Sequence, residues 1–496
     1  MQSLNSTFHF IVDSIPGGQD YVQWWFKLLE ENPTHLYIET TLILVILFIL
    51  AKGQNPTTRR HEVNDDVLAE RLAAFQPTPL APAVLAEDSQ LVLRDTVVLE
   101  SPPCAATCKV QGVDKPVLNF ASTDFLDYGS SPEVTVATEK ALDKYGVGSC
   151  GPRGFYGTID AHVRLEEAIA QYFGANEAII YSDASSAVAS AIPAFANRSD
   201  MLVVDDGSNE NIMTGVRLSR AKLMFFKHGD MADLERVLKH VEADDKRLGR
   251  RPDQQRRFVV FEGLSRNFGD IADMQRIVEL KQRYKWRLLV DESLSVGVLG
   301  KTGKGVTEHC GVPVSSIEIL VASLETSLAS VGGFCVGSYE VVEHQRLNGA
   351  GYCFSASAPP FTATAAEAAL KLLNSARGSN DLETLRGLAE HFAAQLKGDA
   401  RLAVASSAMS PVVHVRLTAK YPTLLEENKA LRDIARKLLS DGVALVVPVH
   451  YTPAPAGSPA PPPLSLRLFL HVTHSKDHHT RTAKALSAAA ACLHKV

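Results

Sequence analysis

The chain has 496 residues, and its 50 lysine and arginine residues against 56 aspartate and glutamate residues give a formal net charge of -6. This acidic balance gives no support for a nucleic-acid-binding surface. The length allows about three domains of ~150 residues, or one large α/β unit with appendages. The seven cysteines are scattered and odd in number, which is typical of reduced thiols in the cytosol.

The first 60 residues are predicted to face a membrane. Asp20 to Glu31 is rich in aromatic and leucine residues, which indicates either an interfacial helix or a segment packed on a helix of a partner. Leu36 to Ala51 is almost entirely apolar and predicts a single transmembrane helix, short but sufficient for a thin bilayer at about 1.5 Å per residue. A cleaved signal peptide fits less well, because no basic region precedes the apolar run.

Charge predicts the orientation of this span. Acidic residues lie before it or at its start, whereas Lys52, Arg59 and Arg60 follow it. Because basic residues stay on the cytosolic side, the N-terminus is expected in the lumen and the remainder of the chain in the cytosol. The Asn5-Ser6-Thr7 sequon would then face the lumen.

Proline separates this region from a globular part. A short helix is predicted from Asp65 to Phe75, and the prolines that follow make the next segment irregular. We therefore divide the chain into an N-terminal membrane segment at 1–60, an arm at 61–115, a large domain at 116–348 and a small domain at 349–496.

The large domain alternates short β-branched runs with helical patterns, which predicts a largely parallel, seven-stranded sheet covered by helices. No GxGxxG motif follows the first strand, which disfavours a dinucleotide-binding domain. Lys239 to Arg257 carries charges of both signs and predicts a solvated loop. The predicted strands are Glu177–Ser182, Leu202–Asp206, Lys222–Lys227, Phe258–Glu262, Arg287–Asp291, Glu318–Ala322 and Gly333–Val336.

The small domain is predicted to be α+β, with a proline-rich exposed insert at Pro453–Pro463. A last helix is expected to end at Leu493 and to be capped by Thr473 or Ser475. The other helices are predicted at Thr362–Arg377, Leu382–Leu396 and Leu424–Leu439, and the strands at Val412–Leu417, Val443–Val449 and Leu464–Val472.

The turn between the last two strands of the large domain carries the main functional signal. Ser323, Glu325, Thr326 and the sequence Gly332-Gly333-Phe334 resemble the pattern by which α-oxoamine synthases present a catalytic lysine, and Thr326 takes the lysine position. Pyridoxal phosphate (PLP) chemistry needs a primary amine there, which threonine cannot supply. An acid followed by a small polar residue is similar to the non-catalytic large subunits of serine palmitoyltransferase, the long-chain base subunit 1 group.

This resemblance implies a fold-type I PLP-dependent transferase with several altered cofactor positions. Asp291 matches the aspartate that holds the pyridine nitrogen, while Leu294 and Asn209 replace family histidines, the second of which stacks on the ring. The phosphate-binding turn reads Ser182 to Val188, where Asp183 would repel a phosphate dianion. Asn209, Asp291, Thr326 and Arg467 are thus vestigial cofactor-site positions, and no catalytic residue is expected in this chain.

A second motif, Gly146 to Glu166, is nearly complete and is characteristic of the same subunit group. The resemblance implies that Cys150, Arg153 and Tyr156 line the active site of a partner, and that Ser330, Gly332 and Gly333 approach its cofactor phosphate. The alternative is that the glycines of the first motif only form a tight turn before a helix.

Two further groups of residues can be explained without a functional role. Arg467 matches an arginine that pairs with a substrate carboxylate, although a structural salt bridge suits it equally. Cys104 and Cys108 have the wrong spacing for a metal clip, and the histidines near the C-terminus do not form a metal motif, so no metal is expected. Those histidines are His471, His474, His478 and His479.

The resemblance implies a non-catalytic subunit of an endoplasmic reticulum serine palmitoyltransferase. A lysine-bearing partner subunit would hold PLP and condense L-serine with palmitoyl-CoA at a shared site, and small or regulatory membrane subunits would complete the assembly. Two alternatives stay open: a self-sufficient PLP enzyme that recruits Lys301 or Lys304, and a membrane scaffold with no part in catalysis.

Overall fold

The computed structural model describes residues 18–31, 33–53, 65–77, 97–102, 105–251, 254–448 and 459–493. The Asn5 sequon, Cys104 and most of the proline-rich insert lie outside these residues. The chain separates into one compact unit at Met1–Gln90 and a second at Leu91–Val496, and each is described by itself. The four segments expected from the sequence stay a prediction.

The first unit contains three helices within its described residues: α2 (Gly18–Glu31), α3 (Pro33–Gly53) and α4 (Asp65–Ala74). Helix α3 exposes every apolar side chain from Leu42 to Leu50, each between 48% and 63% accessible. Within the described ranges, no helix combines the length and hydropathy that a membrane span requires, so the predicted transmembrane helix is not confirmed.

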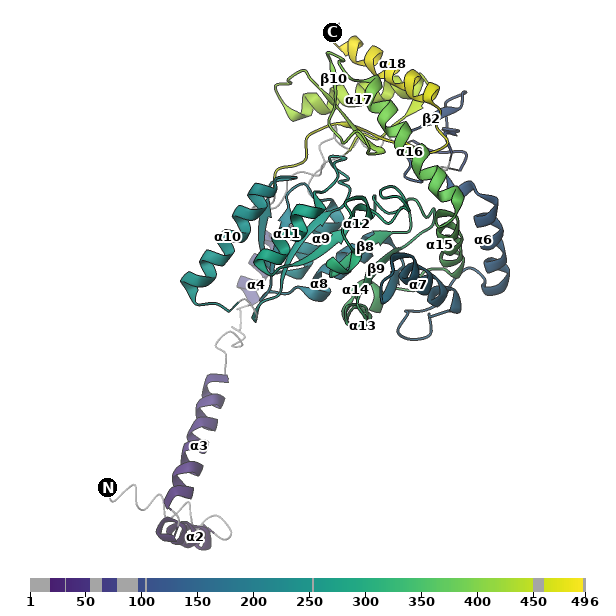
Figure 1. Cartoon of the computed structure of the whole chain (residues 1–496). Helices are drawn as coiled ribbons and strands as arrows, with labels where there is room; N and C mark the ends of the chain where they lie inside the picture. The colour runs from purple at the N-terminus through teal and green to yellow at the C-terminus, as the bar shows by residue number, and fades with distance from the viewer. Residues whose placement is uncertain are drawn as a thin grey trace. The chain divides into compact units, whose positions relative to one another are not determined.

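The second unit is organised around a seven-stranded sheet of order β3-β9-β8-β7-β6-β4-β5 (Figure 1). Strand β9 runs antiparallel to both of its neighbours and the other pairs are parallel, as predicted for a mostly parallel sheet. The strands are β3 (Glu177–Tyr181), β4 (Met201–Asp205), β5 (Lys222–Phe226), β6 (Arg257–Glu262), β7 (Arg287–Asp291), β8 (Ile319–Ser323) and β9 (Gly333–Gly337).

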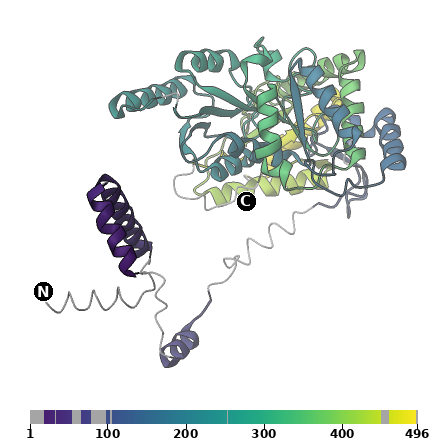
Figure 2. The ribbon, with the colours of Figure 1, turned by 90° about the horizontal axis from the view of Figure 1, so that it is seen from below.

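Helices cover both faces of this sheet, because successive residues of a strand point to opposite sides (Figures 1 and 2). Ile179, Leu202 and Val260 face one layer, which contains α8 and α9. Ile180, Val203 and Val259 face the other, which contains α7, α10, α11 and α15. The helices of the sheet region are α6 (Pro132–Tyr145), α7 (Asp160–Phe173), α8 (Ala184–Phe195), α9 (Glu210–Ser219), α10 (Met231–Leu248), α11 (Met274–Tyr284), α12 (Val306–His309), α13 (Tyr339–Asn348), α14 (Ala350–Cys353) and α15 (Pro360–Leu373), with 3-10 turns η2 (Tyr128–Ser130) and η4 (Val314–Ser316).

The prediction of a loop at Lys239–Arg257 is wrong for the first half of this segment. Helix α10 continues to Leu248 and ends at Gly249 in the left-handed conformation (φ 62°). Its charges are arranged as pairs one helical turn apart, such as Lys246 with Glu242 at 2.8 Å. Apolar residues Leu234, Val237 and Val241 recur on its buried face, and this period holds the segment in a helix.

The C-terminal part of the second unit forms two small sheets. Strands β10 (Leu402–Val404), β11 (Val412–Leu417) and β13 (Leu466–Phe469) pair antiparallel, while β1 (Thr107–Cys108) and β2 (Val117–Asn119) join β12 (Val443–Ala444). Helices α16 (Ala376–Gln395), α17 (Leu424–Ser440) and α18 (Lys476–Leu493) accompany them. Ser475 caps α18 by accepting a hydrogen bond from the amide of His478, which confirms one of the two predicted caps.

Candidate functional site

The candidate site lies where the carboxyl ends of neighbouring parallel strands meet. Glu262 ends β6, Asp291 ends β7, and the register of the sheet pairs these two residues. Both side chains are buried, at 9% and 2% accessibility. Polar groups gathered at this edge of an open α/β sheet form the usual place for a ligand.

Asn209 joins the two carboxylates. Its backbone amide donates to Oε2 of Glu262 at 3.0 Å, and its side-chain Nδ2 donates to Oδ2 of Asp291 at 2.9 Å. Its Oδ1 accepts from the amides of Asn211 and Ile212, so it also caps helix α9. Asn209 is 6% accessible, and both polar atoms of its side chain are hydrogen-bonded within the protein.

Two buried glutamates at this edge have raised pKa values. Burial, followed by the negative charge of Asp291, raises the pKa of Glu262 to about 7. Burial also raises the pKa of Glu292 to about 7, against hydrogen bonds from Ser295 and the amide of Val306. Burial away from water favours the neutral, protonated form of a carboxyl group. Neither glutamate was recognised from the sequence, although their positions at the ends of strands offered a signal.

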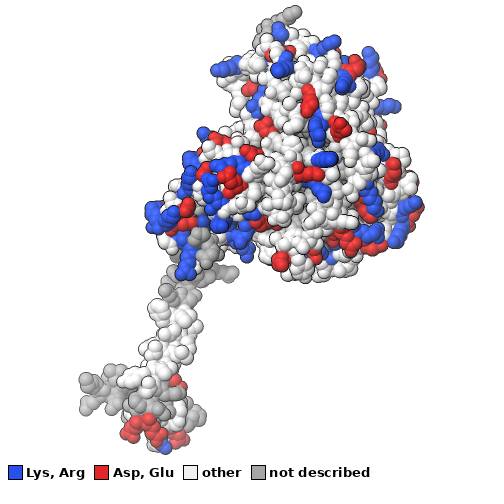
Figure 3. Space-filling model, in the orientation of Figure 1, with Lys and Arg blue, Asp and Glu red and all other residues white. Residues whose placement is uncertain are grey.

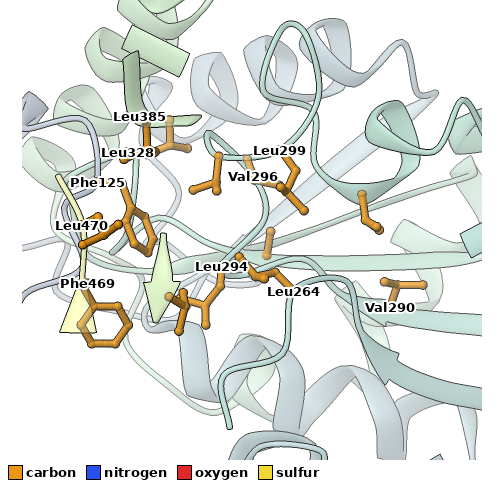
Figure 4. Packing of buried hydrophobic residues seen from close by; sticks show 14 of the residues in the cluster. Phe125, Leu264, Val290, Leu294, Val296, Leu299, Leu328, Leu385, Phe469 and Leu470 are labelled. Atoms are coloured by element: carbon orange, nitrogen blue, oxygen red, sulfur yellow. The ribbon is translucent and has the colours of Figure 1, made fainter. Parts of the chain in front are cut away.

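Thr326 lies in the turn between β8 and β9, as predicted. Its Oγ1 donates to the carbonyl oxygen of Ser293 at 2.9 Å, and the residue is 7% accessible. Leu294, the residue after Ser293, packs beside Leu264 in an apolar cluster at the same edge of the sheet (Figure 4). The hydroxyl of Thr326 therefore serves a local turn contact.

Carboxylates surround the first turn of helix α8. Asp183 caps the helix, since its Oδ1 accepts from the amide of Ser186 at 2.7 Å. Glu325, from the β8–β9 turn, accepts from the amide of Ala184 at 3.4 Å. A helix N-terminus attracts anions because its first amides are unpaired and its dipole is positive there. Here two carboxylates of the chain already meet that need.

Arg467 on β13 is a buried cation. It is 8% accessible, its Nη1 donates to the carbonyl oxygen of Arg266 at 3.2 Å, and its Nε has no partner. Burial, followed by repulsion from Arg266, lowers the pKa of Arg467 to about 10. Within the described residues no carboxylate lies within 4.0 Å of it, so no structural salt bridge holds it there.

Arg266 and His414 were missed from the sequence. The carbonyl oxygen of Arg266 contacts both Arg467 and Nε2 of His414, the latter at 3.0 Å. Burial, followed by the charge of Arg467, lowers the pKa of His414 to about 4. A neutral imidazole therefore adjoins the buried guanidinium, which avoids a second positive charge.

The Gly146–Glu166 motif divides into buried and exposed residues. Arg153 forms a bidentate ion pair with Glu166, with nitrogen–oxygen distances of 3.0 and 2.9 Å, and only 6% of it is accessible. Cys150 is exposed at φ 60°, and Tyr156 is 76% accessible. Ser357 anchors the loop, because its amide donates to the carbonyl oxygen of Gly151 and its hydroxyl donates to that of Gly157. The structure thus leaves Cys150 and Tyr156 available to a partner, and turns Arg153 inward.

Ser330, Gly332 and Gly333 follow the β8–β9 turn. Ser330 donates to the carbonyl oxygen of Thr362 at 2.7 Å. Gly332 has φ 127°, which a residue with a side chain rarely adopts. A Cβ on Gly333 would lie 2.6 Å from that of Ala187, so this glycine lets β9 approach helix α8. Their predicted approach to a partner's phosphate stays a prediction.

The two lysines considered as substitutes for the missing amine lie in the segment between β7 and α12. Nζ of Lys304 lies over the ring of Tyr172, 5.6 Å from its centre. Lys301 is exposed.

Nitrogen atoms of the C-terminal histidines contact the backbone. Nε2 of His474 lies 3.0 Å from the carbonyl oxygen of Asn119, and Nε2 of His471 lies 2.8 Å from that of Ser122. Among the described residues, no group of three or more His, Cys, Asp or Glu could hold a metal ion.

Comparisons with known proteins identify the family. A model of the aminotransferase class I and II family matches residues 115–485. Serine palmitoyltransferase 1 of Dictyostelium discoideum is 37% identical over 464 residues, covering 91% of this chain and 92% of the relative. Long chain base biosynthesis protein 1c of Oryza sativa subsp. japonica is 36% identical over 464 residues, covering 92% and 91%. The chain belongs to the serine palmitoyltransferase 1 family.

Solved structures agree with this fold. Serine palmitoyltransferase of Sphingomonas wittichii superposes with a TM-score of 0.69 at 25% identity, covering 87% of this chain and 98% of that protein. A structure described as SPT with a PLP internal aldimine gives a TM-score of 0.71 at 24% identity, covering 83% and 97%. The family resemblance and the fold-type I architecture with its mostly parallel sheet are thereby confirmed.

The residues present do not fit the family cofactor at the site of this chain. Asp291, which the family resemblance places at the pyridine nitrogen, accepts hydrogen bonds from Nδ2 of Asn209 and from the amide of Ser293. The N-terminus of α8 carries the carboxylates of Asp183 and Glu325 where a phosphate would need positive or neutral partners. Thr326 has no amine to offer. We therefore derive no chemical step through PLP in this chain.

Proposed function

We propose that this chain is the non-catalytic subunit of a heterodimeric serine palmitoyltransferase, a pseudoenzyme that stabilises its partner and completes its active site. The partner subunit carries PLP on its lysine and condenses L-serine with palmitoyl-CoA to 3-ketodihydrosphingosine, carbon dioxide and CoA. This is the first step of sphingolipid long-chain base synthesis. The observation that carries the proposal is Thr326 at the lysine position, because its hydroxyl donates to the carbonyl oxygen of Ser293 and it has no amine that could hold PLP.

An exposed apolar surface supports the heterodimer. Phe155 and Tyr156, in the glycine-rich loop, are 77% and 76% accessible, and Phe354 is 87% accessible. Ser357 contacts the backbone of that loop, so Phe354 lies on an adjoining segment. Large aromatic side chains that remain in water on a folded chain indicate a protein interface.

The N-terminal unit anchors the chain in the endoplasmic reticulum membrane in this proposal, with the N-terminus in the lumen and the second unit in the cytosol. The exposed apolar side chains of α3 and the accessible Trp24 and Phe26 of α2 support a lipid environment. Small and regulatory membrane subunits complete the assembly. Protease protection of tags at the two ends of the chain in sealed microsomes tests the orientation.

The decisive experiment compares this chain alone with the chain co-expressed with a lysine-bearing homologue. We expect visible absorbance of lysine-bound PLP, and serine-dependent condensation of palmitoyl-CoA, only in the co-purified complex. Absorbance from the chain alone would make it an enzyme in its own right. A homologue that is equally active without this chain would reduce the chain to a scaffold.

A further inference from the structure

At the edge of the seven-stranded sheet opposite the candidate site, several cations have no carboxylate partner among the described residues. Strands β4, β5, β6 and β7 are parallel, so their amino-terminal ends lie together. The register confirms it: Met201 pairs with both Lys222 and Arg257, and Phe258 pairs with Arg287. We call this region the basic edge, and define it by Arg198, Arg220, Lys222, Arg256 and Arg287.

The cations of the basic edge differ from other charges of the chain. All five are exposed, and within the described part of the chain none has a carboxylate oxygen within 4.0 Å. On the adjacent helix α10, by contrast, Lys239 pairs with Glu235 at 3.1 Å and Arg247 pairs with Asp244 at 3.0 Å. Figure 3 shows Lys and Arg side chains gathered on the surface beside α10.

Acidic residues near the basic edge are used internally. Asp200 is 3% accessible, and its carboxylate accepts from the amides of Asn197 and Arg256. Asp245 pairs with Arg257 at 2.7 Å, and Glu318 pairs with Lys281 at 2.6 Å. The positive charge that faces solvent is therefore not neutralised from within the described residues.

Exposed leucines lie among these cations. Leu218, two residues before Arg220, is 60% accessible, and Leu223, next to Lys222, is 39% accessible. Leu248, at the end of α10, is 54% accessible. Basic residues interspersed with exposed leucines are typical of surfaces that meet lipid, where phosphates attract the cations and the leucines enter the headgroup region.

We propose that the basic edge docks the second unit on an anionic lipid bilayer, independently of helix α3. The cations are spread along several strand ends, a spacing that fits a fluid layer of phosphate headgroups. An acidic protein would instead place carboxylates at fixed positions against individual guanidinium groups. The docking requires no particular activity of the chain, so it stands even if the proposed subunit role does not.

The test uses the full chain with Trp24→Asp and Phe26→Asp in α2 and with Leu44→Asp, Leu47→Asp and Leu50→Asp in α3. Binding by both helices is thereby removed. These changes lie in the separate first unit and leave the second unit intact. Flotation is measured with phosphatidylcholine vesicles, with and without phosphatidylserine, at low and high salt. We expect binding that needs phosphatidylserine and is lost at high salt, because screening weakens attraction between exposed charges.

The basic-edge variant Arg198→Glu, Lys222→Glu and Arg287→Glu is expected to lower the vesicle partition coefficient at least tenfold, on the order of the loss expected from several surface cations. The control, Lys397→Glu, Lys420→Glu and Lys476→Glu, makes the same change in net charge elsewhere on the second unit and is expected to bind normally. Glutamine at the same three basic-edge positions removes the positive charge without reversing it, so we expect an intermediate loss of binding. Circular dichroism checks that every variant is folded.

Equal binding by the basic-edge variant and the control would overturn the proposal, as would binding that ignores phosphatidylserine. A chain that fails to bind these vesicles, yet co-purifies with its lysine-bearing homologue in a salt-sensitive way that the basic-edge variant abolishes, would also overturn it. That result would assign the surface to a protein partner.

Discussion

The amide of Asn209 donates a hydrogen bond to the carboxylate of Asp291, with 2.9 Å between Nδ2 and Oδ2. The same side chain caps helix α9 through Oδ1. One asparagine thus holds a helix start and a buried carboxylate at the sheet edge. At this edge of the sheet, the chain uses a buried carboxylate and a helix start for its own stability.

Replacing Asn209 should therefore destabilise the fold. Asn209→Leu removes both the cap and the partner of Asp291, and we expect a loss of about 3 kcal/mol in the free energy of unfolding. Asn209→Ser keeps a capping hydroxyl and should cost less. Thermal unfolding of the two purified variants measures the difference. A serine variant as stable as the native chain would show that the contact with Asp291 contributes nothing beyond the cap.

Restoring the lysine alone should not restore cofactor binding. Thr326→Lys leaves Asn209 on Asp291 and leaves two carboxylates at the start of α8, so we expect no visible absorbance when PLP is added. Adding Asn209→His, Asp183→Gly and Glu325→Ser to that variant removes these obstacles. Absorbance and borohydride trapping should then appear. Trapping of PLP by the single lysine variant would contradict the view that the site is occupied by the chain's own side chains.

Glu292 should make stability fall as pH rises toward neutrality. Its pKa is about 7 in the folded chain and near 4.5 in the unfolded chain, so the folded state binds more protons between these values. Stability from this group is complete below about pH 4.5 and is lost by about pH 7, a change of roughly 3 kcal/mol.

Glu292→Gln tests this expectation. The amide keeps the shape and an acceptor but cannot ionise, so the variant should match the native chain near pH 5 and exceed it near pH 8. Denaturant midpoints across this range provide the measurement. A variant whose midpoint follows the native curve at every pH would show that Glu292 stays ionised in the folded chain.

Arg153 is expected to contribute to the stability of this chain itself. Arg153→Ala leaves Glu166 buried without its cation, and we expect a loss of about 3–5 kcal/mol. The control is Arg217→Ala, because Arg217 forms an exposed pair with Glu210 on helix α9 and should cost under about 1 kcal/mol. Similar unfolding midpoints for the two variants would show that the buried pair stabilises the fold no more than an exposed pair does.

The exposed aromatic residues should govern assembly. Phe155→Ser with Phe354→Ser removes two large apolar side chains from water, so the isolated chain should unfold at an unchanged temperature. Co-purification with the lysine-bearing homologue should fall at least about tenfold, as expected for buried aromatic residues at an interface. Leu425→Ser, at a 67% accessible position on α17, provides the control. Undiminished co-purification of the double variant would place the interface elsewhere.

Much of the architecture could be read from the sequence. All seven predicted strands of the large sheet are found with ends shifted by at most one residue, because β-branched runs between turns are a local signal. Strand β11 spans Val412–Leu417, as predicted. Strand β12, predicted as Val443–Val449, is assigned only to Val443–Ala444, since its length depends on pairing with β2 far earlier in the chain.

The sequence by itself determined which chemical groups this protein has, above all threonine at the lysine position and asparagine at Asn209. The identity of each residue, and the spacing of apolar residues along a short segment, can be read without knowing which distant residues lie nearby. Only the tertiary structure decided what those groups do: Asn209 bonds to Asp291 across 82 positions, and Glu325 reaches the start of α8 across 141. Such contacts form where the sheet brings strand ends together, and a burial-raised pKa, as at Glu292, exists only inside the packed chain.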